Sequence, residues 1–177
     1  MSAEAYQYRT EVKPADADSV RRIVESSGFF SEEEIEIAVE LVQERLTIGA
    51  QSGYDFVFVE EAGETIGYTC FGRIPCTKAS YDLYWIAVHD SWRGKGIGRR
   101  LLAETEAEIA RLGGERIYLD TSSRKQYEPT RGFYAACGYR QEAILKDFYA
   151  AGDSKVIFAR EIALTGQDQS PNKPPIK

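Results

Sequence analysis

The sequence predicts an α+β fold built on one mixed sheet of about seven strands and four helices. Short apolar runs typical of strands alternate with segments whose apolar residues recur at helical spacing. A strand over residues 83–88, a helix and a strand over 116–121 follow one another, and such a unit places its two strands in parallel. The other strands are joined mostly by short turns and are expected to be antiparallel.

The first part of the chain is predicted to form a strand and two helices. Residues 6–12 contain the strand, and Gly28 ends the first helix. Ser31 is a favourable N-cap for the second helix, and glutamates 32–34 offset the positive end of its dipole. The predicted buried stripe of this second helix consists of Ile35, Val39, Val42 and Leu46.

The middle of the chain is predicted to form the centre of the sheet. Strands over 56–59 and 66–71 flank the turn 61–64, which is the pattern of a β-hairpin. The strand 83–88 reads LYWIAV and is apolar on both of its faces. We therefore expect both faces of this strand to be fully covered.

The rest of the chain is predicted to add two helices and three strands. One helix begins near residue 97 and ends at Gly113, and Pro129 fits the first turn of another, which ends at Gly138. After the strand 116–121, the last two strands are expected over 143–145 and 156–158. The predicted buried stripe of the earlier helix consists of Ile97, Leu101, Leu102, Ile109 and Leu112.

One domain is expected to span residues 1–162, because the chain has 177 residues and no linker separates two cores. The stretch 163–177 contains Pro171, Pro174 and Pro175 and few apolar residues. We therefore expect it to be a flexible C-terminal tail.

The composition disfavours several classes of protein. A formal net charge of −6 is unlike that of a general nucleic-acid binder, which usually has a basic surplus. No apolar run approaches the ~20 residues that span a bilayer, so no membrane partner is expected. Three cysteines without paired spacing, and no N-terminal apolar segment, favour a cytoplasmic protein. The single histidine, His89, cannot build a multi-histidine metal site, and no metal is predicted.

The most informative segment is a glycine-rich turn between the strand 83–88 and the helix that follows. Glycines at 94, 96 and 98 let a ligand approach the unpaired amides of the helix start, which suits a phosphate or pyrophosphate. Cations gather at this turn of a chain that is negative overall, namely Arg93, Lys95, Arg99 and Arg100. We predict an anion site here rather than a helix start that merely tolerates glycine.

Three phosphate-binding patterns compete for this turn. A dinucleotide fingerprint, G-x-G-x-x-G, lacks its third glycine because Arg99 stands there, and the chain has only one βαβ unit. A P-loop is excluded because no lysine followed by Ser or Thr stands at the required place. The pattern R-x-x-G-x-G of a coenzyme A pyrophosphate loop is matched by Arg93, Gly96 and Gly98.

Two segments resemble the signatures of the GNAT superfamily of acetyl-CoA-dependent N-acetyltransferases. Residues 86–98, IAVHDSWRGKGIG, are similar to its acetyl-CoA motif, and residues 133–139, FYAACGY, resemble its second signature, F-Y-x-x-x-G-F/Y. The order of elements from residue 6 to residue 162 is also similar. The resemblance implies a V-shaped split between the two central parallel strands, with acetyl-CoA lying in it as the cosubstrate.

The resemblance also implies which residues bind acetyl-CoA. Main chain at 86–88 would pair with the pantetheine arm, and the amides of 93–98 would bind the pyrophosphate. The implied cofactor-binding residues are Ile86, Ala87, Val88, Arg93, Gly94, Lys95, Gly96, Ile97, Gly98 and Arg99. Tyr127 and Thr130 depart from the family pattern, which often has asparagine and alanine there. Arg131 is expected on a solvated helix face, and contact with a phosphate of the cofactor is the alternative.

Acetyl transfer requires that the amine lose a proton and that the leaving thiolate gain one. Tyr134 matches the general acid of the family, and the alternative is a core tyrosine with a satisfied hydroxyl. Asp82 is the candidate base, acting directly or through water, and an ordinary polar residue at a strand end is the equal alternative. We expect Asp82, Tyr84, Ile86 and Val88 to share one face of their strand.

Two aromatic loops would flank the mouth of the acceptor site in this family. One carries Phe29 and Phe30, and the other carries Tyr149. Loops on a rigid frame often carry specificity, and hydrophobic anchoring is the alternative for both.

The resulting hypothesis is an N-acetyltransferase that moves an acetyl group from acetyl-CoA directly to a primary amine of a small molecule or protein. The alternative is a non-catalytic acyl-CoA-binding regulatory module, and Tyr134 discriminates the two because a binder needs no acid. An NAD-linked oxidoreductase is disfavoured by the missing third glycine. The sequence leaves the acceptor open, and a homodimer is compatible with it.

Overall fold

In the computed structural model, which describes residues 6–162, the chain forms seven strands and four α-helices. The strands are β1 (Gln7–Arg9), β2 (Asp55–Glu61), β3 (Glu64–Arg73), β4 (Ser80–Val88), β5 (Arg116–Ser122), β6 (Arg140–Ala150) and β7 (Asp153–Glu161). The α-helices are α1 (Asp16–Ser26), α2 (Glu32–Ile48), α3 (Ile97–Arg111) and α4 (Glu128–Ala136). Short 3-10 helices are η1 (Gly49–Ser52), η2 (Asp90–Trp92) and η3 (Lys125–Tyr127).

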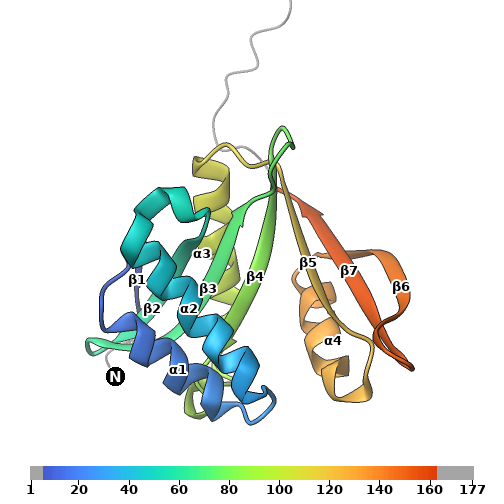
Figure 1. Ribbon diagram of the computed structural model, residues 1–177, viewed down its shortest axis with the longest axis horizontal. Helices are drawn as coiled ribbons and strands as arrows, with labels where there is room; N and C mark the ends of the chain where they lie inside the picture. The colour runs from blue at the N-terminus through green and yellow to red at the C-terminus, as the bar shows by residue number, and fades with distance from the viewer. Residues whose placement is uncertain (1–5, 163–177) are drawn as a thin grey trace, which may run out of the picture.

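The described strands form one mixed sheet in the order β1-β2-β3-β4-β5-β7-β6 (Figure 1). Neighbouring strands are antiparallel except for β4 and β5, which are parallel. The α+β class and the parallel central pair predicted from the sequence are confirmed.

Helices cover the two faces of the sheet unequally (Figure 1). α1 and α2 pack on the β2 and β3 part of one face, where Val24, Val39 and Phe58 belong to one core cluster. α3 and α4 pack on the other face, where Leu101 and Tyr134 belong to a second cluster. Within residues 6–162, no helix covers β5, β7 and β6 on the face that carries α1 and α2.

The start of α2 confirms the predicted N-cap. The Ser31 hydroxyl accepts a hydrogen bond from the Glu34 amide, and the Glu34 carboxylate accepts one from the Ser31 amide at 2.8 Å. This reciprocal capping box satisfies helix-start amides that would otherwise lack partners. The predicted apolar stripe is correct at three positions of four, because Leu46 is exposed on the last turns of α2. The same correction applies to Leu112, which is exposed beyond the end of α3.

The β2–β3 hairpin is confirmed, with Glu61 paired to Glu64 across a two-residue turn. Ala62 and Gly63 have φ angles of 50° and 82°, the backbone that lets a tight hairpin follow the strand twist. The opening strand is shorter than the expected 6–12, because only residues 7–9 pair with β2. Beyond Arg9 the chain turns toward α1.

The parallel pairing between β4 and β5 is short. Only residues 80–82 of β4 pair with residues 116–118 of β5, and beyond them the two strands diverge (Figure 1). This confirms the split implied by the family resemblance. The prediction that 83–88 is fully covered is wrong, because residues 85–88 are only partly buried and Tyr84 is exposed. The missing neighbour strand explains the exposure, since β5 no longer lies beside this part of β4.

A β-bulge in β4 changes which side chains share a face. Leu83 pairs with Phe71 and Trp85 pairs with Cys70, which leaves Tyr84 as the extra residue. A bulge shifts the alternation of the residues that follow it. Tyr81, Leu83, Ile86 and Val88 therefore pack against the α3–α4 cluster, while Trp85 and Ala87 pack against the other. The expectation that Asp82 shares a face with Ile86 and Val88 is wrong for this reason.

The expected tail at 163–177 lies outside the described residues. Within residues 6–162 no helix is long and apolar enough to cross a membrane. The same residues contain no group of three or more His, Cys, Asp or Glu side chains that could hold a metal ion.

Candidate active site

The glycine-rich turn has a backbone that favours glycine. Gly94 and Gly96 each have a φ of 77°, a left-handed conformation that other residues adopt with strain. Gly96 is the N-cap of α3, and the next residue, Ile97, is buried and anchors the helix start in the core. The turn therefore connects η2 to α3, and the first amides of the helix face outward.

The main-chain amides of residues 94–99 donate no hydrogen bond within the part of the chain that the structure describes. The first bond of α3 is donated by Arg100 to the Gly96 carbonyl at 3.2 Å. The Arg93 amide is occupied, because it donates to the Asp90 carbonyl at 3.2 Å. The run of free amides thus begins at Gly94, one residue later than expected. A continuous run of free donors at a helix N-terminus is a favourable anion site.

The cations of the turn are held by defined contacts. The Arg93 Nε lies 3.5 Å from the Val88 carbonyl oxygen, and its guanidinium is 3.4 Å from the Asp90 carboxylate. The Lys95 ammonium lies 4.1 Å from the centre of the Trp92 ring. Both side chains remain beside the free amides and add positive charge there.

Two further residues of the turn connect α3 to α4. The Arg99 side chain donates to the Ala136 carbonyl at 3.2 Å, at the end of α4. A Cβ atom built on Gly98 would lie 3.7 Å from the Phe133 ring, so the start of α3 lies against the residue that precedes Tyr134. These contacts bring the two sequence signatures together at one end of the split.

The β4 strand, which leads into this turn, also has main-chain groups without a partner in the sheet. The His89 amide donates to the Ile66 carbonyl of the neighbouring strand β3 at 2.9 Å. Because main-chain groups alternate in direction along an antiparallel pair, Ile86 and Val88 direct theirs away from β3. These groups face the side where β5 has diverged, so the sheet provides no partner for them. Ala87 packs its side chain against the α1–α2 cluster.

Tyr134 on α4 is 6% exposed and packs in the α3–α4 core. Its ring centre lies 5.4 Å from that of Phe133 and 5.9 Å from that of Phe158. The hydroxyl makes no hydrogen bond to any protein group within residues 6–162. Burial raises the pKa of Tyr134, and the Asp120 carboxylate raises it further. The phenol is therefore protonated at neutral pH and able to donate.

Asp82 lies where the two central strands part, in the last paired position of β4. Its carboxylate makes no hydrogen bond or ion pair within the described residues, and it is half-buried. Burial raises the pKa of Asp82, the Asp120 carboxylate raises it further, and Lys155 opposes both. An unpartnered carboxylate whose pKa is raised is better suited to accept a proton near neutral pH than an ordinary aspartate.

The predicted acceptor residues lie on separate sides of the split. Phe29 is 51% exposed, and its ring centre is 5.9 Å from the Arg93 guanidinium carbon. Phe30 packs on Trp85, with ring centres 5.2 Å apart. Tyr149 on β6 is exposed, and its hydroxyl donates to the Asp120 carboxylate at 2.8 Å. Phe29 therefore lies beside the glycine-rich turn, and Tyr149 lies beside the Asp120 carboxylate.

Sequence reasoning missed Asp120 and misjudged Arg131. Asp120 lies between the buried neighbours Leu119 and Thr121 on β5. A charged residue at this position of a strand indicates that the strand face carrying it is open to solvent. Arg131 is not simply solvated, because its guanidinium donates to the carbonyls of Ser122 and Arg124 at 2.7 and 3.1 Å. It fixes the connection between β5 and α4.

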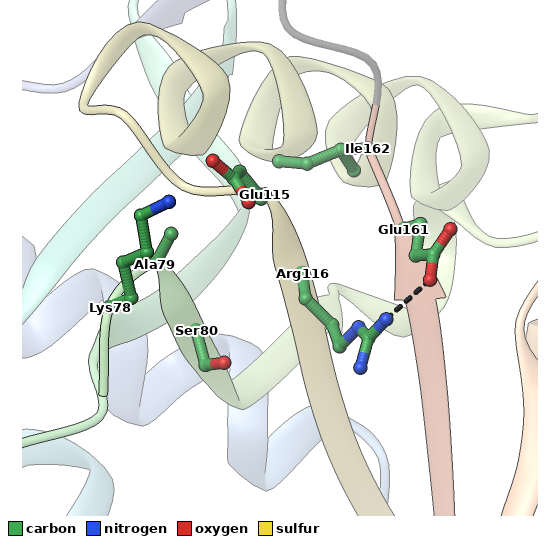
Figure 2. A pocket seen from close by; sticks show the side chains of 7 residues that line it. All are labelled: Lys78, Ala79, Ser80, Glu115, Arg116, Glu161 and Ile162. Carbon is green, nitrogen blue, oxygen red and sulfur yellow. Dashed lines mark hydrogen bonds and ion pairs between the residues drawn. The ribbon is translucent and has the colours of Figure 1, made fainter. Parts of the chain in front are cut away.

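A cavity of about 580 Å³ lies elsewhere, at the end of the sheet where β4 and β5 remain paired (Figure 2). It is lined by polar and apolar side chains and crossed by the Arg116–Glu161 ion pair (Figure 2). Its lining residues are Lys78, Ala79, Ser80, Glu115, Arg116, Glu161 and Ile162. None of the free amides and neither catalytic candidate belongs to it.

The glycine-rich turn and α4 fall within a stretch that is similar to a known family. A sequence profile described as an acetyltransferase (GNAT) domain matches residues 52–141. The chain belongs to the GNAT acetyltransferase family. A solved GNAT protein from Desulfovibrio desulfuricans is 48% identical, with a TM-score of 0.88, over 90% of this chain and 100% of that chain.

Other matches include one solved structure with the same fold and two mycobacterial sequences. An aminoglycoside 6′-N-acetyltransferase crystallised with coenzyme A is 20% identical, with a TM-score of 0.69, over 92% of this chain and 99% of that one. The N-alpha-acetyltransferase RimI of Mycobacterium tuberculosis is 29% identical over 103 residues, 58% of this chain and 56% of that protein. An uncharacterized protein of Mycobacterium leprae is 30% identical over 108 residues, 60% of this chain and 29% of that protein. The match thus spans less than two thirds of either mycobacterial relative.

Proposed function

We propose that this protein transfers the acetyl group of acetyl-CoA directly to a primary amine of a small molecule or a protein. The observation that carries the proposal is the run of unpaired amides at residues 94–99, beside a split whose far wall holds the unpartnered Tyr134 hydroxyl. Anion binding at the amides and proton donation by the phenol are the two requirements that a coenzyme A thioester imposes on a protein.

The residues present fit coenzyme A. The amides of 94–99 would bind the pyrophosphate, and the outward main-chain groups of Ile86 and Val88 would pair with the amides of the pantetheine arm. Arg93 and Lys95 would add positive charge beside the phosphates. A solved relative that contains coenzyme A, with 20% identity and the same fold, supports this assignment.

Acetyl-CoA supplies a thioester carbonyl and a thiolate leaving group. The Asp82 carboxylate accepts, directly or through one water, the proton that the acceptor ammonium loses before the neutral amine attacks. The second proton, which the nitrogen loses as the amide forms, passes to solvent. The Val88 amide is directed toward the split and polarises the thioester carbonyl, a contribution often worth ~3 kcal/mol. The Tyr134 hydroxyl gives its proton to the departing sulfur, and solvent restores it.

The direct test follows free thiol released from acetyl-CoA in the presence of small amines, aminoglycosides and peptides with free N-termini. We expect amine-dependent thiol release, with acetylated amine formed in equal amount. Binding of coenzyme A without transfer to any amine would instead support the non-catalytic binding module. Failure to bind coenzyme A at all would contradict the proposal.

Replacing Asp82 with asparagine should lower kcat/KM by about 10²-fold and change the pH profile. In the unmodified protein, activity falls as pH decreases because Asp82 becomes protonated and can no longer accept a proton. Since the pKa of Asp82 is raised, this loss occurs at higher pH than for an ordinary aspartate, whose pKa is about 3.9. The acidic limb assigned to Asp82 should be missing from the profile of the Asp82→Asn variant.

Asp55→Asn provides a matched control. Asp55 is also a half-buried strand carboxylate whose pKa is raised by burial, but it lies on β2 beside Arg45, away from the split. Its replacement should leave the acidic limb in place. An acidic limb that persists in Asp82→Asn would show that Asp82 is an ordinary strand-end residue.

A further inference from the structure

Asp120 on β5 is the centre of a polar cluster on the open face of the sheet. One of its carboxylate oxygens accepts a hydrogen bond from the Tyr149 hydroxyl at 2.8 Å. The other lies 2.8 Å from the Lys155 ammonium. These residues come from β5, β6 and β7, the strands that no described helix covers on this side (Figure 1). The cluster is therefore accessible to a ligand that enters the split.

The Lys155 side chain shows what this cluster can hold. Its ammonium lies against the Asp120 carboxylate and 4.9 Å from the centre of the Phe148 ring. A carboxylate combined with the face of an aromatic ring is an arrangement that binds alkylammonium groups. Phe148 itself is exposed and packs edge-on against Tyr149, so the ring and the hydroxyl are held together. A primary ammonium of an acceptor would find the same partners.

Independent observations place this cluster beside the reacting groups. The Tyr134 hydroxyl has no hydrogen-bond partner within residues 6–162, although more than nine tenths of the residue is buried. Asp120 lies two residues beyond Tyr118, the β5 residue that pairs with Asp82 at the point where the two strands part. In agreement with this placement, the negative charge of Asp120 raises the pKa of Asp82 and also that of Tyr134. The partners of Asp120 are Tyr149 and Lys155, whereas the Asp82 carboxylate is free to receive the reacting amine.

We propose that Asp120 is a specificity-determining residue that binds a second, non-reacting ammonium group of the acceptor. Tyr149 orients the Asp120 carboxylate, Phe148 supplies the aromatic face, and Lys155 occupies the position while no acceptor is bound. The substrate class is an amine with a second positive charge, and the reacting nitrogen lies at Asp82. This inference rests on the proposed acetyl transfer and adds the kind of acceptor.

The test uses diamines of three to six carbons. Each diamine is compared with the alkylamine and the ω-amino acid that have the same number of carbons. Thiol release from acetyl-CoA gives kcat/KM for each probe. The best diamine should exceed its alkylamine by up to about fivefold, because an exposed ion pair contributes up to ~1 kcal/mol. The amino acids should be the poorest acceptors, because their carboxylate would face Asp120.

Two substitutions should move this preference in opposite directions. Asp120→Asn removes the negative charge and should lower the ratio of diamine to alkylamine kcat/KM toward the statistical value for a molecule with two equivalent nitrogens. Lys155→Met removes the internal competitor and should raise that ratio above that of the unmodified protein. Taking the ratio within each variant cancels any common effect of Asp120 on the proton transfers of Tyr134 and Asp82.

The Arg116–Glu161 ion pair provides matched controls (Figure 2). Glu161→Gln and Arg116→Met make the same changes in net charge at the end of the sheet where β4 and β5 remain paired, and they should leave the ratio unchanged. A ratio that is unaffected by Asp120→Asn, or equally affected by Glu161→Gln, would overturn the proposal. Transfer to other amines but to none of the diamines would overturn it as well, while leaving the proposed function intact. Failure to bind coenzyme A would instead count against the proposed function itself.

Discussion

Replacing Tyr134 with phenylalanine is expected to lower kcat by about 10²-fold or more, the range of a lost general acid. Without the hydroxyl, no group at this position can protonate the departing thiolate. Affinity for coenzyme A should change little, because the hydroxyl contacts none of the amides of residues 94–99 that would bind the pyrophosphate. The measurement is steady-state thiol release together with calorimetric titration of coenzyme A.

Tyr139→Phe is the matched control for this substitution. Tyr139 is also buried near the end of α4, but its hydroxyl is satisfied by the Glu106 carboxylate at 3.0 Å. Removing that hydroxyl should affect stability more than kcat, because Glu106 keeps its ion pair with Arg160. An unchanged kcat in Tyr134→Phe would remove Tyr134 from the mechanism and favour a binding module.

The second large effect is expected for Gly96→Val, which should weaken coenzyme A binding by about 10–100-fold. Charge-assisted hydrogen bonds contribute roughly 1.5–3 kcal/mol each, so misplacing one or two amides is enough. A valine strains the backbone because Gly96 has a φ of 77°. It also fills open space, since a Cβ at Gly96 has no neighbour within 4 Å. That space is where a phosphate must approach the amides.

Gly63→Val separates these two contributions. Gly63 in the β2–β3 turn has a φ of 82° and equally open surroundings. The variant should lose stability to a similar degree, as measured by thermal unfolding, yet bind coenzyme A like the unmodified protein. If Gly96→Val also binds coenzyme A normally, the glycine-rich turn does not bind the pyrophosphate.

Local signals were sufficient for the part of the site that would bind coenzyme A. Gly96 and its neighbours stand where a strand gives way to a helix, and such a junction leaves amides unpaired whatever the rest of the fold does. The N-cap Ser31 and the turn at Gly63 were also predictable, because their conformations depend on a few adjacent residues. These features need no knowledge of distant contacts.

The acceptor side could not be derived in the same way. The bulge at Tyr84 depends on the register between β3 and β4, and the sequence of β4 contains no residue that predicts it. It moved Asp82 to the face opposite Ile86 and Val88. The cluster around Asp120 combines side chains from three strands, and its accessibility depends on which face of the sheet lacks a helix. Strand order and helix placement decide these properties, so they required the structure.

A crystal structure of the protein with coenzyme A tests the central claim most directly. We expect the pyrophosphate oxygens at hydrogen-bond distance, about 2.7–3.2 Å, from amides of residues 94–99, with the sulfur in the split near the Tyr134 hydroxyl. A pyrophosphate held instead in the cavity beside Lys78 and Arg116, with the amides of residues 94–99 still unbonded, would contradict it.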